Sequence, residues 1–204
     1  MVLDSVGIAG RQSYHEPDLW GMDILKVNTS LGAGAIGYLY NDSIYRVGDN
    51  GHAMYEVVFE GPLRSRFNLI YDPWEVEGIP VKVVHQVEIV AGRLCYQSQV
   101  TLSGSAGDMD LVPGIVNIHS DSLHVLDLDE QHTGFMTHAL QAEDTALLAM
   151  ALVVPKMELL SYGETRRSGE GVTETYYVVL DAPEKQPVPL SFLRALGATG
   201  SPLG

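Results

Sequence analysis

Residues 81–102 read VKVVHQVEIVAGRLCYQSQVTL, and they set a pattern that most of the chain follows. Apolar and polar side chains alternate along 81–90 and again along 94–102, with a short glycine-containing connection between them. Because successive side chains of a strand point to opposite faces, this alternation predicts antiparallel strands joined by a turn. Comparable runs, bounded by glycine, proline, asparagine or aspartate, predict strands at 34–40, 44–47, 55–59, 63–71, 81–90, 94–102, 114–119, 122–128, 135–142, 146–154 and 173–180.

The longest uninterrupted apolar run, ALLAMALVV at 146–154, has two interpretations. Periodicity alone does not separate a buried strand from a buried helix of this length. The exit through Val153-Val154-Pro155 favours the strand. As a helix the run would be too short to cross a bilayer, which takes roughly 20 residues, so no membrane span is expected.

About ten strands and little sign of helix predict an all-β protein, a large antiparallel β-sandwich or an open stack of sheets. No repeat or linker divides the sequence, so residues 1–182 are expected to form one β-sandwich domain. Residues 183–204 hold four prolines and three glycines and are expected to form a loose tail. The glycine-rich stretch 32–37 opens a strand rather than a helix, which indicates close backbone packing between sheets instead of a phosphate cradle.

Composition excludes several classes of protein. The 204 residues include 26 acidic and 12 basic side chains, a formal net charge of −14 that would repel the phosphates of a nucleic acid. The 46% hydrophobic content is typical of a packed globular chain rather than a disordered acidic one. The single cysteine, Cys95, cannot form an internal disulfide or a thiolate-rich zinc site. Residues 1–10 do not resemble a secretory signal peptide, and nothing in the sequence assigns a location or an oligomeric state.

One candidate site lies on the predicted strand 63–71. Arg64, Arg66 and Asn68 occupy alternate positions, so their polar side chains share one face of the strand, while Leu63, Phe67, Leu69 and Tyr71 lie on the other. Two guanidiniums in a chain with few cations can bind and neutralise a carboxylate, as a uronic acid would require. The alternative is that both arginines simply pair with acidic side chains at the surface.

A second candidate is the irregular segment around Tyr14, His15 and Trp20. Binding groups often collect on such loops. His15 has the chemistry of a general base, Tyr14 that of a general acid, and Trp20 can stack on a pyranose ring. The alternative is a loop that caps the sandwich.

The remaining histidines carry weaker signals. His85 shares its strand face with apolar side chains, which favours a core or half-buried position. His119 is followed by Asp121 and His124, but this spacing matches no strong zinc signature, so no metal site is expected. Nucleotide-binding and hydrolase motifs are missing too, so no cofactor is expected. Residues 126–132 are interpreted as a solvated turn.

A series of short motifs resembles a bacterial family in order and spacing, over residues 11–180. These motifs are Tyr14-His15-Glu16, Gly21-Met22-Asp23, Lys26-Val27, Ser30-Leu31-Gly32-Ala33-Gly34, Glu60-Gly61-Pro62-Leu63-Arg64 and Tyr71-Asp72-Pro73-Trp74. Members of the family were long catalogued only as a domain of unknown function. They occur with polysaccharide lyases and glycosidases in carbohydrate-utilisation systems.

The resemblance implies a galactose-mutarotase-like supersandwich fold. Members are usually longer, carry a signal peptide and are often periplasmic or extracytoplasmic, so the resemblance implies that this chain is a truncated piece of the family domain. One member type is an oligosaccharide dehydratase of ulvan degradation, which removes water from a terminal uronic acid and leaves an unsaturated uronyl end. By this resemblance the partner is an acidic oligosaccharide and the protein is a carbon–oxygen lyase.

We assign residues to that reaction as a hypothesis. The catalytic residues would be His15 and Tyr14 for proton transfer and Arg64 at the carboxylate, and the substrate-binding residues would be Arg66, Asn68, Trp20, His85 and His119. Two alternatives stay open. One is another sugar enzyme on the same scaffold, an epimerase or a glycoside hydrolase, with Glu16, Asp18 and Asp23 as candidate carboxylates. The other is a non-catalytic glycan-binding module with Trp20 and Trp74 as platforms.

Overall fold

The computed structural model describes residues 23–49, 51–104, 108–141 and 146–196. Within these ranges the chain forms thirteen β-strands and no helix. The strands are β1 (Ala33–Tyr40), β2 (Ser43–Arg46), β3 (Gly51–Phe59), β4 (Arg64–Val76), β5 (Ile79–Val90), β6 (Cys95–Gly104), β7 (Asp110–Val116), β8 (His124–Asp127), β9 (His132–Gln141), β10 (Ala146–Pro155), β11 (Leu159–Glu164), β12 (Thr175–Leu180) and β13 (Val188–Leu196). None of the described segments is a helix long and apolar enough to cross a membrane.

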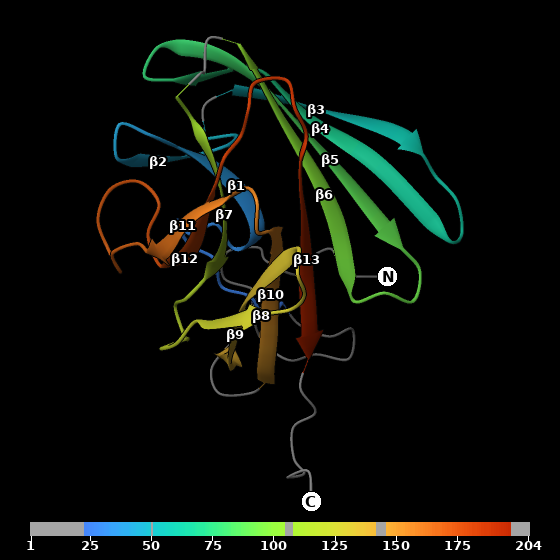
Figure 1. The fold of residues 1–204 in the computed structure, drawn as a ribbon, viewed down its shortest axis with the longest axis vertical. Coiled ribbons are helices and arrows are strands. Elements are labelled where there is room, and N and C mark those ends of the chain that lie inside the picture. The colour runs from blue at the N-terminus through green and yellow to red at the C-terminus, as the bar shows by residue number, and fades with distance from the viewer. Residues whose placement is uncertain (1–22, 50, 105–107, 142–145, 197–204) are drawn as a thin grey trace, which may run out of the picture.

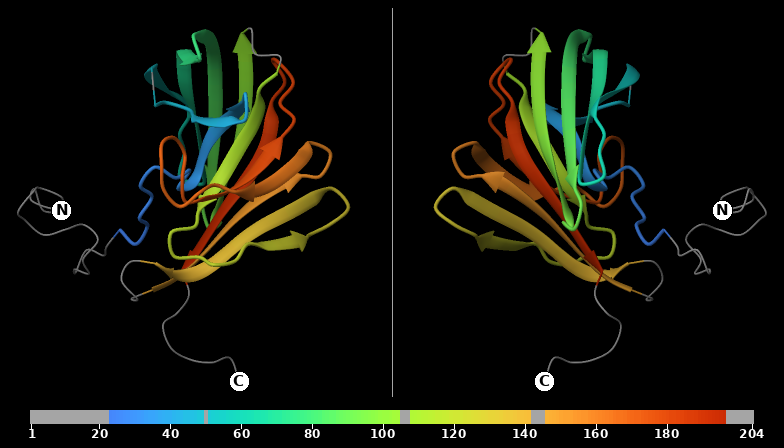
Figure 2. Two further views of the ribbon diagram at one scale, coloured as in Figure 1. Left: turned by 90° about the vertical axis from the view of Figure 1, so that its left-hand side faces the viewer. Right: turned by 90° about the vertical axis from the view of Figure 1, so that its right-hand side faces the viewer.

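The strands form two antiparallel sheets that pack as a sandwich (Figures 1 and 2). The smaller sheet has the order β11-β12-β7-β1-β2, and the larger one has the order β3-β4-β5-β6-β13-β10-β9-β8. The predicted all-β sandwich is therefore confirmed. The finer likeness to a galactose-mutarotase-like supersandwich stays a prediction.

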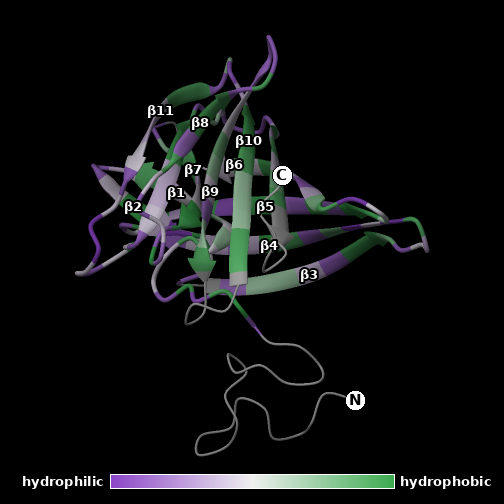
Figure 3. Cartoon of the chain, turned by 90° about the horizontal axis from the view of Figure 1, so that it is seen from below, coloured by the Kyte–Doolittle hydropathy of each residue, from purple (hydrophilic) through white to green (hydrophobic). Residues whose placement is uncertain are grey.

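The core lies between the sheets and follows from the alternation in the sequence. Trp74 and Tyr38, whose ring centroids are 5.8 Å apart, come from opposite sheets and are almost fully buried. Alternate residues of β5, β6, β13 and β10 point into this core, for example Val83, Leu102 and Phe192. Several connecting loops are hydrophilic, whereas β10 is largely apolar (Figure 3). The run at 146–154 is a strand, as its exit predicted.

A close approach between the sheets occurs at Gly34 of β1. The Tyr96 hydroxyl of β6 donates a 3.0 Å hydrogen bond to the Ala33 carbonyl. A Cβ on Gly34 would lie 1.9 Å from that hydroxyl oxygen, and Gly34 has a φ of +99° that other residues rarely adopt. The predicted role of the glycine-rich stretch in close backbone packing is thus confirmed at this position.

The expectation of a loose tail over residues 183–204 was wrong for residues 188–196, and residues 197–204 lie outside the described ranges. Residues 188–196 form β13, which is paired on both sides, with β6 and β10, in the middle of the larger sheet. Val188, Leu190 and Phe192 alternate toward the core, so a strand pattern was present but was obscured by the neighbouring prolines. Pro189 lacks an amide hydrogen, yet it lies within the strand opposite Gln99. Strand β11 was also not predicted.

Candidate functional site

The face of the eight-stranded sheet that is directed away from the smaller sheet carries polar groups that could bind a ligand. On β5 the side chains of Val83 and Val87 are buried, so Gln86 and Glu88 point outward. Register places Arg66, Glu88 and Gln97 side by side across β4, β5 and β6. We call this surface the outer face.

Two guanidiniums converge on one carboxylate at one side of the outer face. Arg64 donates from Nη2 to Glu88 Oε2 over 2.7 Å, and Arg66 donates to the same oxygen from Nε over 2.7 Å. The side chains of Arg64, Arg66 and Glu88 are 51%, 31% and 11% exposed, respectively. The two ion pairs are therefore open to solvent and not internal. The Arg64 and Arg66 guanidiniums, Arg64 contributing most, lower the pKa of Glu88 and keep it ionised.

This cluster has unused capacity for an anion. Two guanidiniums face one carboxylate, which leaves a formal charge of +1. Of the residues described, none accepts a hydrogen bond from Nε or Nη1 of Arg64, or from Nη1 of Arg66. The Phe59 ring lies beneath both groups, 5.2 Å and 5.4 Å from the two guanidinium carbons, and this contact orients them.

Side-chain amides extend the polar surface from this cluster. Asn68 donates to Glu56 on β3 at 2.8 Å and accepts from Gln86 on β5 at 3.1 Å. The side-chain amides of Gln97 and Gln99 on β6 make no hydrogen bond to any group in the described part of the protein. A small cavity of about 150 Å³ is lined by Arg64, Arg66, Gln86, Glu88, Gln97 and Gln99. Amides present both donors and acceptors, which suits the hydroxyl groups of a sugar.

A second and larger cavity of about 360 Å³ lies on the same face, farther across the sheet. It shares Gln97 and Gln99 with the first cavity. Its other lining residues come from β6, β13, β10, the β8–β9 connection and the start of β9, and they include Ser191, Val153, Pro155, Pro189, Asp129 and His132.

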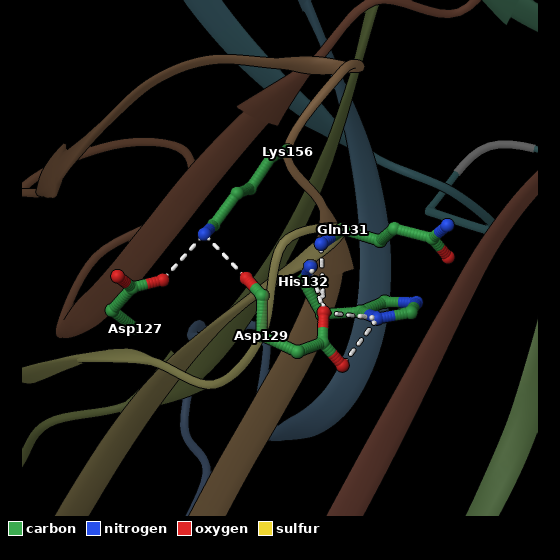
Figure 4. A network of polar contacts seen from close by, with 5 residues as sticks. All are labelled: Asp127, Asp129, Gln131, His132 and Lys156. Atoms are coloured by element: carbon green, nitrogen blue, oxygen red, sulfur yellow. Dashed lines mark hydrogen bonds and ion pairs between the residues drawn. The ribbon is translucent and has the colours of Figure 1, made fainter.

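His132 is held in a defined orientation by Asp129 (Figure 4). The Asp129 carboxylate accepts hydrogen bonds of 2.7 Å from the amides of Gln131 and His132, and 3.0 Å separates it from His132 Nδ1. These contacts, the Gln131 amide first, lower the pKa of Asp129. An ionised carboxylate only accepts, so Nδ1 carries the proton of this hydrogen bond and Nε2 lies on the side of the ring away from Asp129. Lys156 contacts both Asp127 and the Asp129 carbonyl oxygen.

The structure brings together part of the candidate site that the sequence predicted. Arg64, Arg66 and Asn68 lie on one face of β4, in the arrangement expected for a strand. Tyr14, His15 and Trp20 lie outside the described residues.

His85 and His119 do not reach this cluster. His85 is 6% exposed and points to the opposite side of β5 from Glu88, where it hydrogen-bonds Ser98 at 2.8 Å. Burial lowers the pKa of His85 to about 4. His119 is exposed and follows the end of β7, which is a strand of the smaller sheet. Across the described ranges no three His, Cys, Asp or Glu side chains are grouped so that they could hold a metal ion.

Sequence reasoning missed Asp129 and His132, because the acidic segment 126–132 has the composition of a solvated turn. It missed the role of Glu88, Gln97 and Gln99 because their meeting with β4 depends on strand register. The one sequence signal for these three residues was their place among the polar positions of the alternating runs 81–90 and 94–102.

Comparison with curated proteins and with solved structures gave no match. A family model does match the sequence over residues 1–196, which is nearly the whole chain. The chain therefore belongs to the family described as Domain of unknown function (DUF4861).

Proposed function

We propose that this protein binds an acidic oligosaccharide on the outer face and eliminates water from its terminal uronic acid. The observation that carries the proposal is the cluster of Arg64 and Arg66 around Glu88, which retains a positive charge and free donors on an exposed surface. In a chain of net charge −14, such a site favours a localised anion over an extended polyanion. The adjacent amides supply partners for sugar hydroxyls.

The chemistry follows from the position of the carboxylate. A base removes the proton from the carbon next to the uronate carboxylate, and the electron pair of that C–H bond becomes a C=C bond. The neighbouring C–O bond breaks, and the leaving hydroxide takes a proton and departs as water. Guanidiniums at the carboxylate stabilise the enolate-like charge that develops during this step. His15 and Tyr14, assigned through the family resemblance, are the proposed base and acid.

A non-catalytic glycan-binding module is the second candidate. It is favoured by the makeup of the small cavity, in which Glu88 is the single carboxylate and no histidine takes part, as far as the described residues go. Glu88 is tied to both arginines and is a poor proton acceptor.

Turnover separates these two functions. Uronate-terminated oligosaccharides are incubated with the protein while the ultraviolet absorbance of the unsaturated product is recorded. Loss of a charged hydrogen-bonding partner typically costs 1.5–3 kcal/mol, so Arg64→Gln is expected to lower kcat/KM roughly ten- to hundred-fold.

The matched control is Arg93→Gln, which removes the same charge from the exposed β5–β6 turn. It should leave turnover unchanged. Binding of the oligosaccharide without any absorbance change would select the binding module, and equal losses in both variants would reject the guanidinium site.

A further inference from the structure

We propose that the larger outer-face cavity is a second saccharide subsite, which takes an uncharged pyranose of the same ligand. This inference rests on the proposed function and specifies its ligand as an oligosaccharide that runs across the strands. The two cavities lie on one face and are joined by Gln97 and Gln99, which line both.

The lining of the larger cavity suits a sugar ring. A pyranose has hydroxyl groups around its rim and C–H groups on its faces. The amides of Gln97 and Gln99 and the hydroxyl of Ser191 have no hydrogen-bond partner among the described residues, so all three are free for a ligand. Val153 and Pro189 provide an apolar surface for the C–H face.

His132 adds a directed hydrogen-bonding group. Because Asp129 binds Nδ1 and fixes the ring, Nε2 on the other side of the ring can bind a sugar hydroxyl without reorienting. The ring is partly exposed, with 42% of its side chain accessible, and it lines the cavity.

Local charge selects an uncharged sugar at this subsite. Among the described residues that line the larger cavity, Asp129 is the one carboxylate and none is a lysine or arginine. The negative charge of Asp129 opposes a carboxylate on the ligand, whereas Arg64 and Arg66 line the small cavity together with a single carboxylate, Glu88. The opposite signs at the two ends place the acidic terminus of the ligand at Arg64 and Arg66.

Strand geometry sets the length of the ligand. Five steps between neighbouring strands separate β4 from β9, in the order β4-β5-β6-β13-β10-β9. At roughly 4.8 Å a step, the path along the sheet is about 24 Å. One sugar ring cannot contact both ends, so the ligand that uses both cavities is an oligosaccharide of several residues.

The test compares two probes by calorimetric titration. One is a tetrasaccharide with a terminal uronate followed by neutral residues, and the other is the disaccharide from the same acidic end. His132→Ala is expected to weaken the affinity for the tetrasaccharide roughly tenfold, because one hydrogen-bonding group and its packing are lost. The affinity for the disaccharide should be unchanged. Ser191→Ala should act in the same direction with a smaller, several-fold effect.

The matched control is His138→Ala, an exposed histidine six residues farther along β9. It should change neither affinity. If His132→Ala and Ser191→Ala leave the tetrasaccharide affinity unchanged, or weaken both probes equally, the second subsite is refuted. If the wild-type protein binds neither probe, the proposed function itself fails, and the subsite built on it is refuted as well.

Discussion

His85 offers a quantitative test of the packing described for the larger sheet. Its imidazole lies on the inward side of β5, almost fully buried against Ser98, and burial lowers its pKa to about 4 from the ordinary 6.5. The folded protein therefore keeps the ring neutral at a pH where the unfolded chain protonates it. Stability is highest above pH 6.5 and is lost as the pH falls toward 4.

The size of this loss follows from the two pKa values. A difference of about 2.5 pKa units corresponds to about 3 kcal/mol of unfolding free energy at full effect. Between about pH 7.5 and pH 5 the linkage relation gives a loss of about 2 kcal/mol. The carboxyl groups with shifted pKa values, Glu77, Glu88, Asp110 and Asp129, are present both in the wild type and in a His85 variant, so the difference between the two proteins reports on His85.

The measurement is urea unfolding of the wild type and His85→Gln at these two pH values. Glutamine can retain a hydrogen bond to Ser98, and it does not titrate. We expect the unfolding free energy of the wild type to fall by about 2 kcal/mol more than that of the variant between pH about 7.5 and pH about 5. Equal losses in the two proteins would contradict the buried position of His85.

Three further predictions concern other named contacts. Gly34→Ala should destabilise the protein by more than the roughly 1–3 kcal/mol typical of a strained backbone, since the new Cβ would also lie 1.9 Å from the Tyr96 hydroxyl oxygen. Urea unfolding should show that the double variant Gly34→Ala/Tyr96→Phe recovers part of the lost stability. Trp74→Ala should cost about 3–5 kcal/mol by emptying the contact with Tyr38, and an unchanged unfolding midpoint would argue against their packing. Phe59→Leu should weaken binding of a uronate-terminated oligosaccharide roughly two- to five-fold in calorimetric titration, because both guanidiniums lose their aromatic contact; unchanged affinity would mean that the ring does not orient them.

The fold was predictable where alternation is uninterrupted. In β5 the inward Val81, Val83 and Val87 alternate with outward residues, so the sequence pattern alone predicts both the strand and its two faces. In β13 the same pattern is present, but Pro187 and Pro189 are typical of irregular segments and obscure it. Tertiary pairing with both neighbours stabilises a strand that local preference does not favour.

The candidate site was predictable only within one strand. The shared face of Arg64, Arg66 and Asn68 is a local property of an alternating strand. The partner of the arginines is not, because Glu88 reaches them through the register of β4 against β5. The large cavity depends on still longer-range pairing, which places His132 and Asp129, across β10, at the same cavity as residues of β6 and β13.

The most direct test of the acidic-oligosaccharide site is calorimetric titration with two forms of one ligand. The first is a uronate-terminated oligosaccharide, and the second is the same oligosaccharide with its terminal carboxyl group reduced to an alcohol. Wild-type protein is expected to bind the acid roughly ten- to hundred-fold more tightly than the alcohol, and Arg64→Gln/Arg66→Gln should abolish that difference. Equal affinity of the wild type for both forms, or an undiminished preference for the acid in the double variant, would contradict a carboxylate site at this guanidinium pair.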